Sequence, residues 1–261
     1  MPDFPPIITL LTDFGTADYY VAAMKGVILS IAPQARLVDV SHEVESQNVL
    51  SGAYLLANSV LWYPAGTIHL VVVDPGVGSE RRIIAGRWGD QIIIAPDNGL
   101  VSLVQQNTPA AETYELSDRQ YFLPEVSDTF HGRDIMAPVA AHLACGTPLS
   151  ALGAAIDHPL IIHLPRPEVI DNRLVGQVMH VDRFGNLITN IKADQFREFA
   201  PKTVHIKDRV ISSLVATYAD VPIGRPLAAV GSSNMLEISV NQGNARAELA
   251  AGVGAEVLLA R

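Results

Sequence analysis

The sequence predicts an α/β protein with an N-terminal, mainly parallel α/β sandwich domain and a smaller C-terminal antiparallel β domain that is barrel-like. Strand-like and helix-like segments alternate through the first half of the 261-residue chain, as right-handed β-α-β crossovers require. A proline-rich segment follows near residue 165, and short strand-like runs separated by Gly, Asn and Asp turns come after it. We therefore expect one domain over residues 1–165 and a second over 166–261.

The N-terminal elements follow from hydrophobic periodicity. An apolar run at 7–12 is typical of a strand buried on both faces, and the apolar stripe after it predicts a helix that ends at Pro33. A second stripe from Val49 predicts a helix that ends before Pro64. Further strands are expected at 37–40, 67–73, 83–87 and 91–95, the last two as a hairpin, and a helix at 135–145. Cys145, inside that helix, is expected to be a buried, inert thiol.

The C-terminal part contains short apolar runs bounded by turn residues. Strands are expected at 174–181, 203–206, 227–230, 235–240 and 256–259. This spacing is typical of a small antiparallel barrel or sandwich.

Composition excludes several classes of function. A net charge of -9, with scattered Lys and Arg, leaves no basic surface for nucleic acid, and no nucleic-acid partner is expected. A single cysteine excludes an intrachain disulfide and suits a reducing cytoplasm. No apolar run approaches the roughly 18 residues of a membrane span. We therefore expect a soluble, cytoplasmic protein without a membrane partner.

Three predicted strands end where Asp lies beside Gly. These turns are Asp13-Phe14-Gly15, Asp74-Pro75-Gly76 and Asp97-Asn98-Gly99. Each alone could be an ordinary turn, but ligands of open α/β sheets bind beyond the carboxyl ends of the strands. A carboxylate can accept hydrogen bonds from both hydroxyls of a ribose, and the chain has no glycine-rich phosphate motif. The pattern therefore favours a nucleoside over a nucleotide.

A second polar patch, residues 128–134, places His131 among Arg133 and two aspartates just before the predicted helix. It is either a site or a helix cap with a surface ion pair. No histidine pair has metal-ligand spacing, so neither a metal nor another cofactor is expected.

Two C-terminal patches suit a purine. In residues 181–190, Phe184 could stack on the base and Asn186 could hydrogen-bond to its edge, although the patch could be only a hairpin turn. Residues 231–245 are rich in small polar side chains around one strand, and could be only a pair of turns.

Together these segments resemble, in order and over nearly the whole chain, the S-adenosylmethionine hydrolases, or hydroxide adenosyltransferases, which are relatives of the fluorinating and chlorinating enzymes. The resemblance rests on the motifs LTDFG (11–15), DPGVG (74–78), APDNGL (95–100), TFHGRD (129–134), VDRFGNLITN (181–190) and SSNMLEISVNQGNA, which ends at Ala245. It implies a homotrimer whose substrate lies between the N-terminal domain of one subunit and the C-terminal domain of its neighbour.

The resemblance also implies substrate-binding residues. Asp13 matches the ribose-binding Asp, and Asn186 with the backbone from Val240 to Gln242 matches the adenine site. Positions near the methionine end or the pocket wall match Asp182, Ser233, Glu237 and the aromatic Tyr218.

Departures from the halogenating relatives distinguish the reaction. Asp74 and Val77 replace their Tyr and Thr, and Gly132 replaces their halide-binding Ser. The hydrolase triad maps onto Asp74, Arg81 and His131, with Arg82 as the alternative arginine. The resemblance thus implies hydrolysis of S-adenosylmethionine to adenosine and methionine by water attack on the ribose 5′ carbon. The alternatives are an adenosyl-binding module without catalysis, a chloride-dependent adenosyl transferase and a metal-dependent phosphoesterase.

Overall fold

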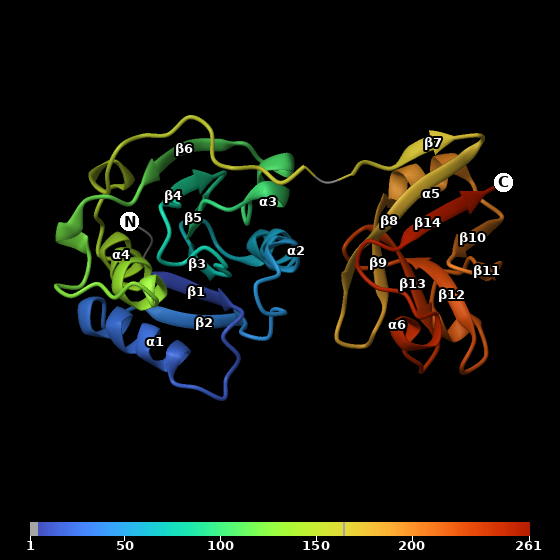
Figure 1. The fold of residues 1–261 in the computed structure, drawn as a ribbon, viewed down its shortest axis with the longest axis horizontal. Coiled ribbons are helices and arrows are strands. Elements are labelled where there is room, and N and C mark those ends of the chain that lie inside the picture. The colour runs from blue at the N-terminus through green and yellow to red at the C-terminus, as the bar shows by residue number, and fades with distance from the viewer. Residues whose placement is uncertain (1–4, 164) are drawn as a thin grey trace. The chain divides into compact units, whose positions relative to one another are not determined.

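The structure is a computed structural model that describes residues 5–163 and 165–261. The chain divides into two compact units, Met1–Ile162 (unit 1) and His163–Arg261 (unit 2), which are shown in Figure 1. Each unit has its own hydrophobic core. Over the described ranges, no helix has both the length and the apolar character needed to cross a membrane.

Unit 1 contains a six-stranded sheet in the order β2-β1-β3-β5-β4-β6. Its strands are β1 (Ile7–Thr12), β2 (Arg36–Ser41), β3 (Ile68–Val72), β4 (Ile83–Trp88), β5 (Gln91–Pro96) and β6 (Ala110–Glu115). The first four in the order are parallel, whereas β4 runs antiparallel to both β5 and β6. The prediction of a mainly parallel sheet is confirmed, although β6 was not foreseen.

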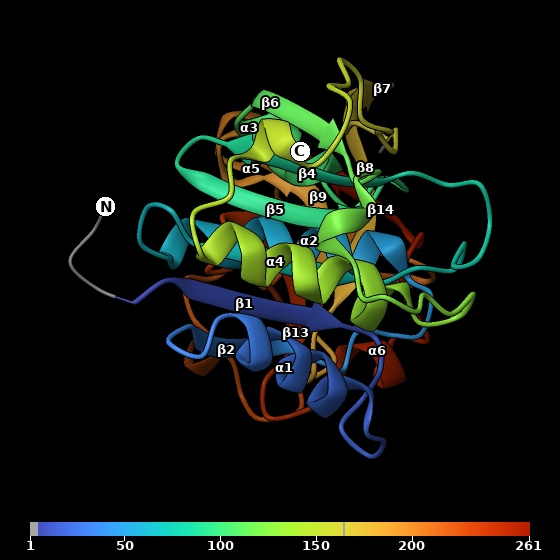
Figure 2. The same cartoon turned by 90° about the vertical axis from the view of Figure 1, so that its left-hand side faces the viewer.

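Helices cover both faces of this sheet. Helix α1 (Tyr20–Ile31) packs beside α4 (Ala137–Ala144), as Figure 2 shows, while α2 (Val49–Ser59) and α3 (Ser102–Asn107) pack together. Because side chains alternate along a strand, Leu10 belongs to the core of α1 and α4, and Leu11 to the core of α2. Short helical turns complete the unit at Val60–Trp62, Arg119–Tyr121 and Leu149–Ala151. Unit 1 is therefore a three-layer α/β sandwich.

The predicted helix at 135–145 differs from the observed one at both ends. It is preceded by a π-helix, η3 (Gly132–Met136), and α4 ends at Ala144. Cys145 caps α4 and precedes Gly146, whose φ of 97° leaves the helical path. Its thiol is exposed, so the expectation of a buried cysteine was wrong.

Unit 2 is a nearly closed antiparallel barrel in the order β11-β10-β14-β8-β9-β13-β12, with β7 paired to β8. Its strands are β7 (Glu168–Ile170), β8 (Arg173–Val181), β9 (Leu187–Lys192), β10 (Thr203–Ile206), β11 (Arg209–Ile211), β12 (Pro226–Val230), β13 (Met235–Val240) and β14 (Glu256–Ala260). The helical elements are α5 (Ala193–Phe199), η5 (Tyr218–Asp220) and α6 (Ala245–Glu248). A bridge between Leu214 and Ala228 brings the two ends of the sheet together. The predicted barrel-like class is confirmed.

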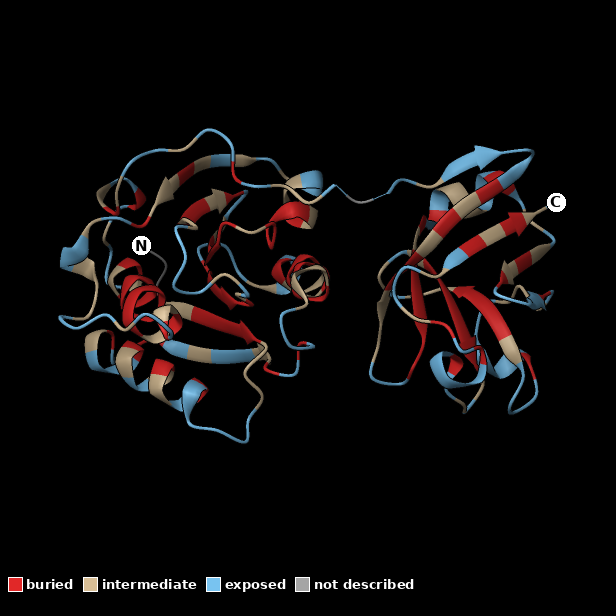
Figure 3. Ribbon diagram, in the orientation of Figure 1, coloured by how far each residue is buried: buried red, intermediate tan, exposed pale blue. Residues whose placement is uncertain are grey.

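A buried polar row crosses the unit 1 sheet. The fully buried ring of His69 lies with Nδ1 2.8 Å from Thr9 Oγ1 and Nε2 3.4 Å from Gln91 Oε1. Figure 3 shows β1 and β3 as buried strands. Burial lowers the pKa of His69 to about 4, and the bond to Gln91 opposes that shift. The native ring is therefore neutral at pH 7.

Protonation of His69 should link stability to pH. Its folded pKa lies below the unfolded value of 6.5, so its contribution is complete above pH 6.5 and is lost as the pH falls toward 4. We expect the free energy of unfolding to fall by about 3 kcal/mol over this pH range because of this group. Urea unfolding at pH 7.5 and 4.5 measures it. In His69→Asn, whose amide oxygen can still accept from Thr9, the difference between the two pH values should shrink; an unchanged difference would contradict the assignment.

Candidate active site

Asp74 lies just after β3, at the carboxyl edge of the unit 1 sheet. Its two carboxylate oxygens each accept from Arg81 Nε at 2.8 Å, and Oδ2 also accepts from Arg81 Nη2. The side chains are 5% and 11% exposed. Gly76 lets the arginine fold back in this way, because an added Cβ would lie 3.2 Å from Arg81 Cδ. The result is a bidentate, largely buried ion pair.

Arg81 also contacts His131, the residue before η3. Its Nη2 lies 3.0 Å from His131 Nδ1. A guanidinium can only donate, so Nδ1 accepts and the proton of the neutral ring is on Nε2. Burial, and then the positive charge of Arg81, lower the pKa of His131, although nearby carboxylates oppose the shift. The imidazole is therefore a neutral ring whose Nε2–H is a donor.

The neighbouring Arg82 makes a different ion pair. Its Nε lies 2.9 Å from Asp97 Oδ2, and Asp97 Oδ1 accepts from the Leu160 amide at 2.6 Å. Asp97, at the third Asp-Gly turn, thus ties the end of unit 1 to the sheet. Of the two arginines, the one that contacts Asp74 and His131 is Arg81.

Asp74 and His131 line a cavity of about 250 Å³ within unit 1. The wall also contains Asp13, Phe14, Ser46, Gln47, Val72, Val77, Thr129, Phe130 and Gly132. Asp13 Oδ2 accepts from the Gln47 amide at 2.8 Å, and within the described chain Oδ1 has no hydrogen bond. The structure therefore brings Asp13, Asp74, His131 and the halide-replacement positions Val77 and Gly132 to one cavity, and Arg81 contacts two of them without lining it.

Sequence reasoning missed the role of Asp134. Its fully buried carboxylate accepts from the Ser127 amide at 2.9 Å, from Ser127 Oγ at 2.7 Å and from Arg133. Burial opposes ionisation, but the bonds from Arg133 and Ser127 outweigh it and lower the pKa of Asp134. Ser127 Oγ in turn accepts from the Phe130 amide at 3.2 Å. Asp134 thus forms the expected ion pair with Arg133, but its carboxylate is buried and it also fixes the loop that carries His131.

Unit 2 has its own cavity of about 720 Å³. It is lined by Asp182, Phe184, Asn186, Ala216, Thr217, Tyr218, Ala229, Val230, Gly231, Ser232, Glu237, Val240, Asn241, Gln242 and Gly243. This set includes every unit 2 residue predicted to bind substrate except Ser233, whose neighbour Ser232 takes part instead.

The β8–β9 turn is organised by Asp182. Its Oδ1 accepts from the amides of Phe184 and Asn186 at 2.9 and 2.8 Å, and Oδ2 accepts from Asn186 Nδ2 at 2.9 Å. Among the described residues the amide oxygen of Asn186 accepts no hydrogen bond, and the ring of Phe184 is 73% exposed. The segment is thus a hairpin turn, and it also presents both side chains that suit a purine.

Glu237, on β13, is held by two hydroxyl groups. Its Oε1 accepts from Tyr218 Oη and from Ser239 Oγ, both at 2.6 Å. Burial, and then the bond to Glu237, raise the pKa of Tyr218 to about 12. Tyr218 therefore stays a neutral donor to the Glu237 side chain.

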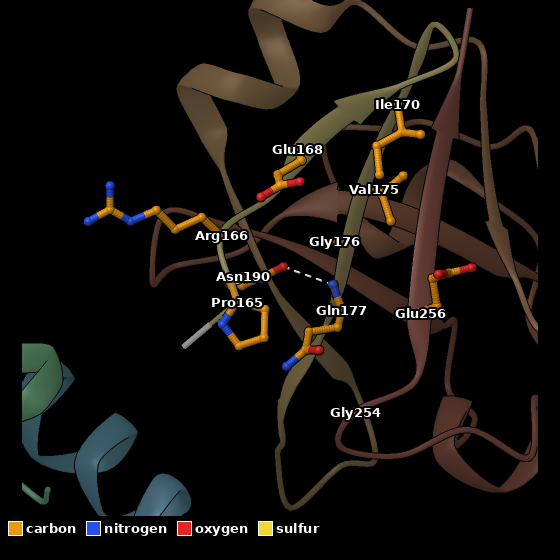
Figure 4. Close-up of a pocket in the computed structure, with 10 residues that line it drawn as sticks. All are labelled: Pro165, Arg166, Glu168, Ile170, Val175, Gly176, Gln177, Asn190, Gly254 and Glu256. Carbon is orange, nitrogen blue, oxygen red and sulfur yellow. Dashed lines mark hydrogen bonds between the residues drawn. The ribbon is translucent and has the colours of Figure 1, made fainter. Parts of the chain in front are cut away.

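Another cavity in unit 2, of about 350 Å³, is shown in Figure 4. It lies by Pro165 and Asn190, whose Oδ1 accepts from the Gln177 amide at 2.8 Å, and Arg166 points away from it. It contains none of the predicted site residues. Within the described ranges, no group of three or more His, Cys, Asp or Glu residues is arranged to hold a metal ion.

Removing the Arg81 charge should raise the pKa of His131, because that cation disfavours the imidazolium. NMR titration of the ring in Arg81→Gln measures the shift, and Arg82→Gln is the matched control because Arg82 pairs with Asp97. Equal titration curves in the two variants would contradict the contact.

Comparisons with known proteins identify the family. Family models described as the SAM hydroxide adenosyltransferase N-terminal and C-terminal domains match residues 8–153 and 176–258. The "(R)-S-adenosyl-L-methionine hydrolase" of Salinispora tropica is 39% identical, with 92% of each chain covered. A "Fluorinase" of an Actinoplanes species is 31% identical, over 90% of this chain and 91% of its own. A crystal structure of an uncharacterized conserved protein from Thermotoga maritima is 37% identical, with a TM-score of 0.92, covering 97% of this chain and 100% of that one. The chain belongs to the SAM hydroxide adenosyltransferase family.

Proposed function

We propose that this chain hydrolyses (R)-S-adenosyl-L-methionine to adenosine and L-methionine. The observation that carries the proposal is the contact of Arg81 with both Asp74 and His131, beside Asp13 in one cavity. The name of the Salinispora tropica relative supports both the substrate and its configuration at sulfur. No metal or other cofactor takes part in the proposed reaction.

The proposed step is a displacement at the ribose 5′ carbon. The water oxygen forms a bond to this carbon as the carbon–sulfur bond breaks, and the electron pair of that bond goes to sulfur. Methionine therefore leaves as a neutral thioether, and no acid is needed for its departure. Only the proton of the attacking water needs an acceptor. A positioned base that takes this proton accelerates such a reaction by about 10²–10⁴-fold.

The hydrogen bonds divide the work between Asp74 and His131. His131 Nδ1 accepts from Arg81, so its Nε2–H donates to the water oxygen and orients it. Asp74 lines the same cavity and takes the proton, while Arg81 fixes its carboxylate. Water positioning and proton removal thus fall to different side chains.

The remaining residues bind the substrate in this proposal. Asp13 Oδ1 accepts from the ribose hydroxyls, Asn186 and the backbone from Val240 to Gln242 bind adenine, and Phe184 stacks on it. The methionine end and pocket wall involve Asp182, Tyr218, Glu237 and, through the resemblance, Ser233.

We further propose that the chain has two domains, divided near residue 165. Three chains form a homotrimer, in which each substrate lies between neighbouring subunits. The separation of the two residue sets into a unit 1 cavity and a unit 2 cavity supports this arrangement. A single free cysteine supports a cytoplasmic location.

Turnover of mixed sulfur epimers in ¹⁸O-labelled water tests the reaction. We expect consumption of the (R) epimer and label in the 5′ hydroxyl of adenosine. Unlabelled adenosine would contradict attack at carbon, binding without product would indicate a binding module, and a 5′-chloro product with added chloride would indicate halide transfer.

Substitutions test the roles of Asp74 and His131. Asp74→Asn and His131→Ala should each lower kcat by about 10²-fold or more, since they remove the base and the donor. His131→Gln should retain more activity than His131→Ala, because the glutamine amide can donate from near the Nε2 position. Stopped or coupled assays of adenosine release measure this, with Arg82→Gln as control. If the glutamine and alanine variants are equally inactive, the assigned donor role is wrong.

A further inference from the structure

The charges of the unit 2 cavity are of one sign. Among the described residues that line it, the acidic side chains are Asp182 and Glu237, and there is no Lys, Arg or His. The remaining lining groups are neutral, including Tyr218, whose phenol stays protonated because burial, and then the bond to Glu237, raise its pKa. The cavity therefore carries two negative charges.

Glu237 is a buried carboxylate without a cation. It is 7% exposed, and within the described chain no basic group lies at ion-pair distance. Hydroxyl donors reach Oε1, whereas Oε2 has no hydrogen bond among the described residues and lies against Gly231, where an added Cβ would be 2.6 Å away. Neutral donors orient this carboxylate but leave its charge uncancelled.

Asp182 adds to the same field. Its donors are two backbone amides and the Asn186 amide group, all of them neutral. A buried charge without a counter-ion is costly in a folded protein. A ligand that brings positive charge to the cavity relieves this cost.

We infer that Glu237, with Asp182, makes the unit 2 cavity select ligands by their positive charge, so that the sulfonium substrate binds more tightly than uncharged adenosyl compounds. The inference rests on the proposed function. S-adenosylmethionine has sulfonium, ammonium and carboxylate charges that sum to +1, whereas adenosine is uncharged and methionine has no net charge. The reaction thus removes the charge that holds the ligand, which favours release of the products.

This role predicts a split between KM and kcat. A field that attracts the sulfonium already acts in the ground state, so it lowers KM without accelerating displacement. Glu237→Gln should raise KM by about tenfold and leave kcat unchanged or higher. Glu198→Gln, which neutralises an exposed carboxylate of the same unit, should change neither value. A fall in kcat with unchanged KM, or no change in either, would overturn the inference.

A second measurement uses the unaltered chain. S-adenosylhomocysteine has a neutral thioether in place of the sulfonium, and sinefungin has an amine-bearing carbon there. We expect the inhibition constant of sinefungin to be at least about tenfold lower than that of S-adenosylhomocysteine, and Glu237→Gln to reduce this ratio. Equal constants in the unaltered chain, or the same ratio in the variant, would overturn charge selection. Calorimetry measures binding of the two inhibitors independently of turnover. If this binding is charge-selective but the chain does not hydrolyse S-adenosylmethionine, the proposed reaction is wrong and the charge selection stands.

Discussion

The site depends on one guanidinium shared by two acceptors. Arg81 gives Asp74 a bidentate partner and donates a further hydrogen bond to His131. The same cation therefore compensates a carboxylate that is 5% exposed and fixes which ring nitrogen of His131 carries the proton. Without it, the carboxylate would be an uncompensated buried charge and the imidazole would have no fixed tautomer.

Local backbone features bring these partners together. Asp74 follows the end of β3 by two residues, and Gly76 leaves room for Arg81 to contact it. His131 comes directly before the π-helix, a form of helix that often occurs at functional sites. The buried Asp134 orders the loop that precedes this helix through Ser127. The geometry of the triad is thus set by strand and helix ends rather than by a free loop.

Hydrophobic periodicity predicted the regular elements whose apolar residues are evenly spaced. The buried strands β1 and β3 and the amphipathic α1 were foreseen, whereas the edge strand β6 and short α3 were not, because charged and polar residues interrupt their patterns. Of the three Asp-Gly turns, those at Asp13 and Asp74 line one cavity, whereas Asp97 of the third pairs with Arg82. The spacing of the motif could not show whether Arg81 or Arg82 pairs with Asp74, because adjacent side chains point in different directions. The structure shows that Arg82 pairs with Asp97, at the end of another strand, which leaves Arg81 for Asp74. Burial of Asp134 was likewise invisible, because it depends on tertiary packing.

Asp74 and the carboxylates of the unit 2 cavity differ in whether a cation accompanies them, and the proposed chemistry explains why. Next to His131, the Asp74 carboxylate is paired with a cation, so its attraction for a sulfonium is reduced. In unit 2, neither Glu237 nor Asp182 forms an ion pair with a Lys or Arg among the described residues. An unpaired carboxylate acting on the breaking carbon–sulfur bond would stabilise the substrate more than the transition state, because sulfur loses its positive charge as the bond breaks. Uncompensated charge in the unit 2 cavity therefore adds affinity, while the paired carboxylate of Asp74 remains available for the water.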